Sequence, residues 1–508
     1  MKLLPEIDSL AVSRVAAPPS AAWFARLDAL LLMVDAERSG ELARLPWGAL
    51  LQREHARLKC RPGHSFALSL PTPRGLRVVV GVRPARADTF QALTLAARMV
   101  REIAAARPSL LGLASLAGHA AADPPATETL LAAVLAATER RPQRKSKPAP
   151  AWRPRLFVCG AADIRATTAV ESGAHLARWL TQLPPNVLGP GAYRRALATL
   201  ARRHRWRMRV YGEAALRRLG AGAFTAVARG SARRDAALVR LEYRPRRAAP
   251  AARRPRGPIA LVGKGLCFET GGLNLKSPKS MLDMHGDMAG SAVAVGILAA
   301  LSDCGYPHPV DAWLALAENR IGPDSYTQQD VVTAVNGTTI QVVHTDAEGR
   351  MVLADTLALA SRTRPACIID FATLTGACVT ALTERLSGVF TNQPRLRDLV
   401  EGAGRRAGER VWTLPMPEDF DEDLDSPVAD VVQCLMDGKG DHIYATRFLS
   451  RFVGAGIPWI HVDLSAAERA GGLAHVPTPT TGFGVRFGAA LLTDAAFLRA
   501  LAARRPRP

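Results

Sequence analysis

The chain has few cysteines and no paired cysteine motif. Its 508 residues include seven cysteines, an odd number, and no CxxC pair. This usage favours the reduced thiols of a cytoplasmic protein over the disulfide framework of a secreted one. An early lysine is followed by no continuous apolar segment, so we expect no signal peptide.

Long apolar runs and several common site motifs are missing as well. No segment approaches the roughly 20 apolar residues of a membrane helix, so we expect no membrane partner. The sequence has no HExxH pair, which excludes a zincin-type metal site. It also lacks the GxxxxGK[ST] spacing of a phosphate-binding loop.

Acidic residues are outnumbered by basic ones. The chain has 66 lysines and arginines against 45 aspartates and glutamates, a formal net charge of +21. One explanation is a GC-rich coding sequence, which increases arginine together with alanine, glycine and proline. The other is a surface that attracts DNA or another polyanion. Composition leaves both open.

The order of strand-like and helix-like segments predicts an α/β protein. Residues 1–138 alternate apolar strands, such as 66–70 and 76–82, with alanine-rich helices, which indicates a small N-terminal α/β domain. Residues 139–164 are basic and proline-rich, as in a linker. Residues 165–508 form a larger domain, for which we expect a central mixed sheet covered by helices.

One segment of the larger domain carries charged residues between a strand and a helix. It follows a strand-like run at 338–343 and precedes a helical pattern at 352–360. Asp346, Glu348 and Arg350 lie at this junction. Ligands of α/β proteins collect at the carboxyl ends of strands, so these side chains are candidate site residues.

A second segment is strand-like at 258–262 and then becomes rich in glycine and loop-like. It contributes Glu269 and Asp287, which bring the carboxylates to four. Carboxylates packed together repel one another unless a cation lies among them. Oxygen-rich sites suit Mg, Mn or Zn, and a pair of such ions activates water for hydrolysis. The alternative is a set of surface acids that never meet.

The two segments resemble the leucyl aminopeptidase (cytosol aminopeptidase) family, whose signatures read roughly VGKGxxFDSGGxxxK, MxxDMGGAA and NTDAEGRL. The spacing agrees: Glu269 and Asp287 are 18 positions apart (287 − 269), and Asp287 and Asp346 are 59 apart (346 − 287). The similarity covers about residues 165–500. It implies a two-metal aminopeptidase that releases N-terminal, leucine-like residues from peptides and assembles as a homohexamer.

The resemblance also implies the ligands of two divalent ions, Zn or Mn. Lys264 and Asp287 would bind the looser ion, and Asp346 the tighter one. Glu348 would bridge the two ions, and so would the position held by Glu269. A lysine ligand must be neutral, which requires a buried site beside a dication.

Further roles follow from the same resemblance. Lys276 would stabilise the developing oxyanion, and Arg350 would hold a bicarbonate ion that acts as general base. The pocket for the N-terminal residue of the substrate would be lined by Met284, Thr373, Leu374 and Gly376.

Several positions depart from the family pattern, among them Glu269, His344, Ala289, Ser291 and His285. Glu269 stands where the family has Asp, and a misplacement of about 1 Å can cost roughly 100-fold in rate. His344 stands where the family has Asn. Its side chain would play no part in the site, contact the substrate or act as an additional metal ligand. Ala289 would be strained if its site requires a positive φ. All charges of the site are present, which favours a working enzyme; the alternative is a weak or inactive member that acts as a DNA-binding or scaffold protein.

Overall fold

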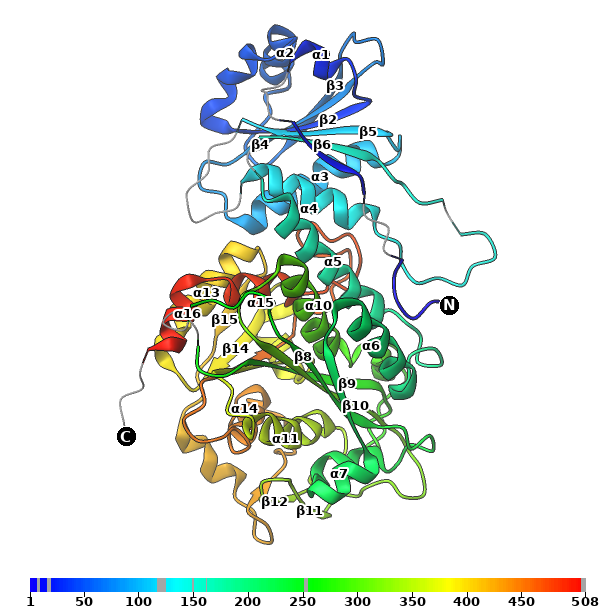
Figure 1. Cartoon of the computed structure of the whole chain (residues 1–508), viewed down its shortest axis with the longest axis vertical. Helices are drawn as coiled ribbons and strands as arrows, with labels where there is room; N and C mark the ends of the chain where they lie inside the picture. Colours follow the sequence, from blue (N-terminus) through cyan, green and yellow to red (C-terminus); the bar gives the residue numbers. More distant parts are fainter. Residues whose placement is uncertain are drawn as a thin grey trace.

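The computed structural model describes residues 1–6, 10–15, 20–116, 125–148, 150–160, 162–250 and 255–503. Two large sheets, one in each half of the chain, are covered by helices, and a small third sheet lies at the far end (Figure 1). The fold is therefore mixed α/β, as the sequence predicts.

The N-terminal sheet has six strands in the order β1-β6-β5-β2-β4-β3. Its central strand β2 is buried on both faces: Leu31 and Met33 pack against α3 and α4, whereas Leu30 and Leu32 pack on the side of α2. This alternation follows from the two-residue period of a strand. The elements are β1 (Val12–Val15), α1 (Ala21–Phe24), β2 (Ala29–Asp35), η1 (Ala36–Arg44), α2 (Gly48–Leu58), β3 (Ser65–Ser69), β4 (Arg77–Arg83), α3 (Thr89–Ala104), β5 (Leu110–Ser115), α4 (Ala126–Thr138) and β6 (Arg155–Cys159).

Strand β6 lies inside the segment 139–164 that the sequence analysis interprets as a linker. It is hydrogen-bonded in parallel between β1 and β5, and Leu156 and Val158 are fully buried. Five residues between prolines and arginines give too little pattern to reveal a strand. We propose that the N-terminal domain extends to Cys159.

The C-terminal sheet has eight strands in the order β15-β14-β17-β13-β9-β10-β8-β7. Strand β9 runs parallel to both of its neighbours, β10 and β13, whereas β8 is antiparallel to β10 and β14 is antiparallel to β17. The sheet is thus mixed. Its strands are β7 (Arg207–Gly212), β8 (Ala237–Tyr243), β9 (Ile259–Glu269), β10 (Val310–Asn319), β13 (Cys367–Ala372), β14 (Ser387–Thr391), β15 (Val411–Thr413) and β17 (Trp459–Asp463).

Helices cover both faces of this sheet. Neighbouring residues of β9 point to opposite faces, since Leu261 packs with α5, α10 and α15 while Val262 packs with α8, α11 and α14. The helices are α5 (Ile164–Thr181), α6 (Pro190–His204), α7 (Glu213–Leu219), α8 (Gly222–Ala228), α9 (Pro278–Met281), α10 (Ala289–Cys304), α11 (Glu348–Ser361), α12 (Gly376–Leu382), α13 (Arg397–Ala407), α14 (Asp441–Ser450), α15 (Val485–Leu492) and α16 (Ala495–Ala502), with 3-10 turns η3 (Met284–Gly286), η4 (Thr383–Arg385), η5 (Pro394–Leu396) and η6 (Glu418–Leu424).

The third sheet lies beside α11 and consists of three short strands. They are β11 (Val331–Thr333), β12 (Thr339–Gln341) and β16 (Val431–Val432). The strand predicted at 338–343 is therefore short and belongs to this sheet rather than to the large one.

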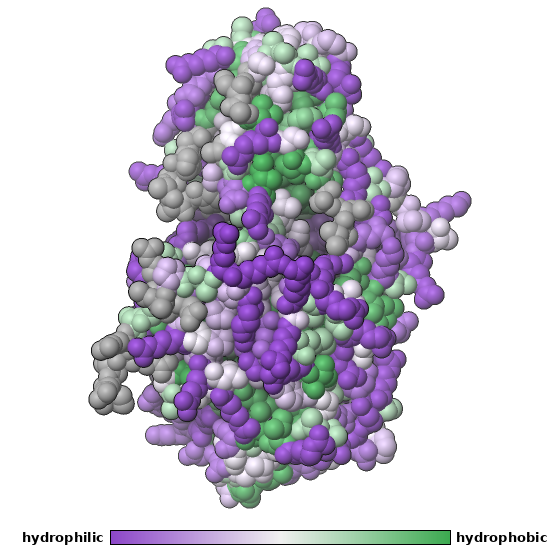
Figure 2. Space-filling model, in the orientation of Figure 1, coloured by the Kyte–Doolittle hydropathy of each residue, from purple (hydrophilic) through white to green (hydrophobic). Residues whose placement is uncertain are grey.

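The segment Pro278–Cys304 is long and apolar enough to cross a membrane by length and composition. Within the structure, however, 83% of its most apolar window is buried. Its main part, α10, lies between the sheet and the helices α5 and α15, which explains why it is apolar all round. On the outer face shown in Figure 2, hydrophilic side chains predominate and apolar ones gather in separate groups.

Candidate metal centre

Strand β9 carries Lys264 within its length and ends at Glu269. The predicted loop begins too early in the sequence: β9 continues through Gly263 and Gly265, and the loop starts only after Glu269. The glycines are needed for packing: a Cβ on Gly263 would lie 2.4 Å from the Cα of Ser291. Glycine therefore lets α10 approach the strand closely without interrupting its hydrogen bonds.

The turn before α11 is anchored through the buried Thr345. Its carbonyl oxygen accepts hydrogen bonds from Asn319 Nδ2 at 2.9 Å and from Tyr326 Oη at 2.6 Å. Its hydroxyl donates to the Gly271 carbonyl at 2.7 Å. These bonds tie the turn to the ends of β10 and β9, which fixes the backbone of the next residue, Asp346.

Lys264 and Asp287 form one half of a buried charged cluster. The Lys264 Nζ lies 2.7 Å from Asp287 Oδ1 and 3.4 Å from Glu348 Oε1. It also donates to the Thr373 carbonyl at 2.9 Å, and the Thr373 hydroxyl donates to Asp287 Oδ1 at 2.7 Å. Strand β9, the turn before α10 and the end of β13 thus meet at this point.

Lys276 joins the other half of the cluster. Its Nζ lies 2.9 Å from Glu269 Oε1 and 2.7 Å from Asp346 Oδ1. Asn319 Nδ2 donates to Glu348 Oε2 at 3.0 Å. Ligand oxygens of Glu269, Asp346 and Glu348 all lie within 4.8 Å of one another, close enough to share a metal ion.

The electrostatics show an excess of negative charge. Burial, with the nearby Glu269, raises the pKa of Asp287 to about 7. The same two causes raise the pKa of Glu348 well above its ordinary value. Burial alone would lower the pKa of Lys264, but Asp287 and Glu348 outweigh it and raise this pKa. Two lysines do not balance four carboxylates, and a divalent cation would relieve the repulsion.

The donor set fits divalent metal ions. Glu269 Oε2 and Asp287 Oδ2 are buried and have no hydrogen-bond partner among the described residues. A buried oxygen without a partner is costly, and a cation satisfies it. Carboxylate oxygens are ligands of Mg, Mn and Zn, so the residues present suit the two-metal site that the sequence predicts.

Arg350 lies in the first turn of α11 and is 2% exposed. Its Nη2 donates to both oxygens of Asp441, at 2.8 Å and 2.7 Å. Its Nη1 donates to the Gln433 carbonyl at 3.2 Å, and the Gln433 side chain donates to the Ala347 carbonyl at 3.0 Å. The guanidinium is thus held by α14 and by the segment that follows β16.

Comparison with known proteins decides the family. Residues 175–488 match the catalytic domain of the cytosol aminopeptidase family.

The chain belongs to the cytosol aminopeptidase family.

Its relatives include two cyanobacterial proteins described as probable cytosol aminopeptidases. The protein of Parasynechococcus marenigrum (strain WH8102) is 35% identical over 469 residues, which cover 90% of this chain and 94% of the relative. That of Synechococcus sp. (strain CC9311) is 34% identical over 448 residues, covering 85% and 88%.

Solved structures are also similar to this chain. The bottromycin maturation enzyme BotP in complex with Mn is 33% identical, with a TM-score of 0.78, and the match covers 94% of this chain and 100% of that one. A mutant of tomato leucine aminopeptidase has a TM-score of 0.81 at 24% identity, covering 96% and 98%, and so supports the fold alone.

The predicted pocket residues differ in how closely they approach the cluster. Thr373 contacts it directly, and Leu374 Cδ1 would lie 3.0 Å from a Cβ on Gly349, in the first turn of α11. Met284 is in the 3-10 turn just before Asp287. Gly376 begins α12 and is exposed. Their contact with a substrate remains a prediction.

Two departures from the family pattern have a structural explanation. Ala289 begins α10 and is not among the residues with positive φ. The backbone strain that a positive φ would cause at an alanine therefore does not arise. His344 Nδ1 accepts the backbone N–H of Asp346 at 3.2 Å. His344 therefore helps to shape the turn that presents Asp346.

Several residues that hold the site together are not predicted from the sequence. Asn319 ends β10 beside β9, and the rule that ligands collect at the carboxyl ends of strands could have found it. Tyr326, Gln433 and Asp441 come from loops or a helix start far along the chain, and no local pattern marks them.

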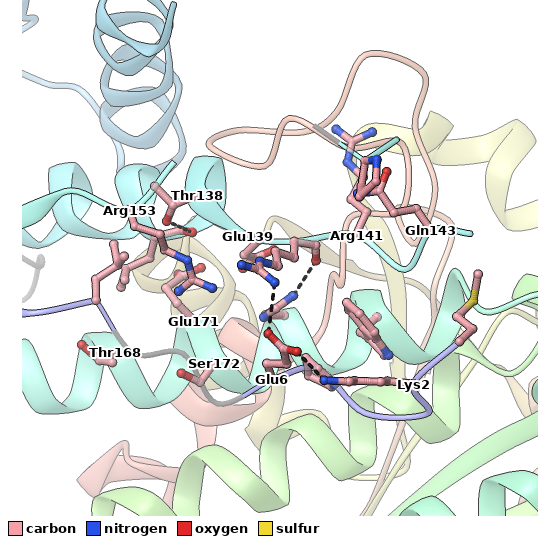
Figure 3. A pocket seen from close by; sticks show the side chains of 18 of the residues that line it. Lys2, Glu6, Thr138, Glu139, Arg141, Gln143, Arg153, Thr168, Glu171 and Ser172 are labelled. Atoms are coloured by element: carbon pink, nitrogen blue, oxygen red, sulfur yellow. Dashed lines mark hydrogen bonds and ion pairs between the residues drawn. The ribbon is translucent and has the colours of Figure 1, made fainter. Parts of the chain in front are cut away.

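A cavity lies elsewhere in the molecule. It encloses about 390 Å³ beside α5, between the N-terminal residues and the segment after α4 (Figure 3). Glu6 in its lining forms ion pairs with Lys2 and with Arg140, the latter at 3.0 Å. The cavity shares no lining residue with the charged cluster, so it does not mark the metal centre.

Proposed function

We propose that this cytosol aminopeptidase family member is a working metal-dependent exopeptidase that releases N-terminal, leucine-like residues from peptides. One observation carries the proposal: side chains from separate segments meet in a single buried cluster. Its members are Lys264, Glu269, Lys276, Asp287, Asp346 and Glu348.

Five of these side chains would hold two divalent ions, Zn or Mn. Lys264 and Asp287 would bind one ion and Asp346 the other, with Glu269 and Glu348 between them. When bound, the ions supply positive charge that activates a water molecule and polarises the peptide carbonyl. The complex of BotP with Mn supports Mn as one choice.

The remaining roles fall to residues around the metal ligands. Lys276 is held protonated between Glu269 and Asp346, because these acids raise its pKa against the opposite effect of burial. A fixed ammonium at this place would stabilise negative charge on the carbonyl oxygen. The N-terminal side chain of the substrate would contact Met284, Thr373, Leu374 and Gly376. A bicarbonate ion on Arg350 is implied by the family resemblance.

Hydrolysis of a leucyl amide, with Zn or Mn added, tests the proposal. We expect activity in the wild type and a loss of about 1,000-fold or more in Asp346→Ala, because a metal ligand is removed. Asp324→Ala is the control, since this aspartate is 73% exposed. Metal content is measured on the same samples. A wild-type protein that neither hydrolyses the amide nor binds metal would contradict the proposal. It would favour the alternative of an inactive DNA-binding or scaffold protein, which predicts salt-sensitive DNA binding.

A second candidate function is suggested by the solved relative. BotP is a bottromycin maturation enzyme that is 33% identical over 94% of this chain. The same chemistry would then serve the maturation of one particular peptide. A panel of amides with different N-terminal residues separates the two, because a general exopeptidase accepts several of them and a maturation enzyme accepts few.

We also propose that the protein is a cytoplasmic homohexamer, as the family resemblance implies. Light scattering of the purified protein measures the assembly directly. A mass near that of one chain, 54.3 kDa, would contradict it.

A further inference from the structure

The charge of Arg350 is already balanced within the chain. The guanidinium keeps its proton even when buried, so it needs an acceptor or a counter-charge. Asp441 provides both, because its two carboxylate oxygens lie 2.8 Å and 2.7 Å from Arg350 Nη2. The Arg350 side chain is only 3% exposed, and that of Asp441 is 23% exposed.

The Asp441 carboxylate is placed by the fold. Asp441 is the first residue of α14, where the helix dipole favours a negative side chain. Gly440 has a φ of +63°, a left-handed conformation that turns the chain into the helix. The helix is fastened further along by Arg447, whose Nε donates to Asp421 Oδ1 at 2.8 Å. The carboxylate therefore belongs to a fixed element.

A free anion would have to compete with this carboxylate. Arg350 Nε has no hydrogen-bond partner among the described residues, but it is buried and offers no open surface. An anion that reached Nη2 would displace Asp441 and leave two negative groups side by side, which is unfavourable. Separation of a buried ion pair is also costly.

We infer that Asp441 is a built-in counter-anion of Arg350, which takes the place expected for bicarbonate, so that this chain works without bicarbonate. The inference rests on the proposed peptidase function. Asp441 acts through Arg350 and is therefore a positioning residue. Removal of its carboxylate would open an anion site on Arg350.

The test compares the wild type with Asp441→Gly and Asp441→Ala, which both remove the carboxylate and make room. Leucyl amide hydrolysis is measured at constant pH in CO₂-free buffer, with and without added bicarbonate. We expect no response in the wild type. Each variant should lose about tenfold or more in kcat without bicarbonate and regain most of it when bicarbonate is added. Asp437→Asn is the matched control, because Asp437 lies in the loop just before α14 and is 52% exposed.

Binding of ¹³C-bicarbonate, followed by NMR line broadening, gives a readout that needs no hydrolysis. We expect both variants to broaden the ¹³C-bicarbonate resonance and the wild type to leave it unchanged. It would support the inference even if the wild type hydrolysed no peptide, in which case only the proposed function fails. Broadening or activation of the wild type by bicarbonate, or folded variants that neither bind it nor recover, would overturn the inference. Circular dichroism checks folding, and Asp441→Ala keeps a helix-forming residue if Asp441→Gly unfolds.

Discussion

The charged cluster depends on how far each carboxylate reaches from its backbone. Glu269 is the departure that matters most, because its side chain is one methylene longer than the family residue. Its Oε1 accepts from Lys276 at 2.9 Å, and one of its carboxylate oxygens lies within 4.8 Å of oxygens of Asp346 and Glu348. The longer side chain thus reaches both the lysine and the neighbouring acids, and we expect the cluster to be adapted to glutamate.

Glu269→Asp tests this adaptation. Shortening the side chain by one methylene withdraws the carboxylate by roughly 1 Å, and kcat/KM should fall by about 100-fold. Kinetics on a leucyl amide, with metal content measured in parallel, provide the comparison. Glu422→Asp, an exposed position of η6, serves as control and should match the wild type. An increase in activity of Glu269→Asp would instead show that glutamate impairs the site.

At the level of elements, the site depends on the close packing of α10. Helices α5 and α10 cross at a pair of glycines, Gly173 and Gly296. A Cβ on Gly296 would lie 2.5 Å from the Gly173 carbonyl oxygen, and one on Gly173 would lie 2.4 Å from the Gly296 carbonyl oxygen. The backbones therefore touch at this crossing. The turn that carries Asp287 leads directly into α10, so the crossing also positions a proposed ligand.

Gly296→Ala should destabilise the protein through this crossing. The added methyl group has no room, and overpacking of this kind typically costs about 1–3 kcal/mol in the free energy of unfolding. Gly40→Ala is the control: Gly40 is also in a helical turn, but a Cβ there meets nothing within 4 Å. Urea denaturation monitored by circular dichroism measures both. Equal stability of the two variants would show that the helices can move apart.

The sequence predicts those elements whose pattern is local. Strands β3 and β4 were found because apolar residues are continuous or alternate along them. The sequence predicts strand β9 too short, because glycines in a sequence usually indicate a loop. The structural role of these glycines is close contact with α10, a helix that lies later in the chain and leaves no local pattern. In the same way, motif spacing predicts Asp346 and its companions as site residues, whereas it does not predict Asp441, because its partner Arg350 is distant in sequence.

In the whole molecule, a buried ionic network helps to join the two halves. Glu171 on α5 forms an ion pair with Arg486 on α15 and lies 3.1 Å from His475 Nε2. Arg178 lies about two turns further along α5. It pairs with Glu139 at the end of α4 and donates to the carbonyl oxygen of Thr481 in the C-terminal segment. The N-terminal domain, the first helix of the second domain and the last part of the chain thus meet in one network.

This network should make stability depend on acid pH. Burial alone would raise the pKa of Glu171, but His475, Arg486 and Arg178 lower it to about 2. Since the folded value lies below the unfolded value near 4.5, the stabilisation is complete above pH 4.5 and is lost as the pH falls toward 2. The linked free energy is about 3 kcal/mol.

Glu171→Gln and the wild type are compared by urea unfolding at a series of pH values. The variant should be less stable at neutral pH, and the difference should shrink as the pH falls below about 4.5, because the wild-type carboxylate becomes protonated. A difference that stays constant down to the acid transition would show that the carboxylate charge contributes nothing to stability.

The wide separation of the site residues along the chain has a consequence for biosynthesis. Lys264 and Asp441 are 177 positions apart (441 − 264), and the other proposed metal ligands lie between them. A ribosome that has released only the N-terminal domain and β9 exposes two of the six cluster residues, Lys264 and Glu269, with no partner from α11. The cluster can therefore form only after the start of α11 has left the ribosome, so that a nascent chain carries no complete site before that point.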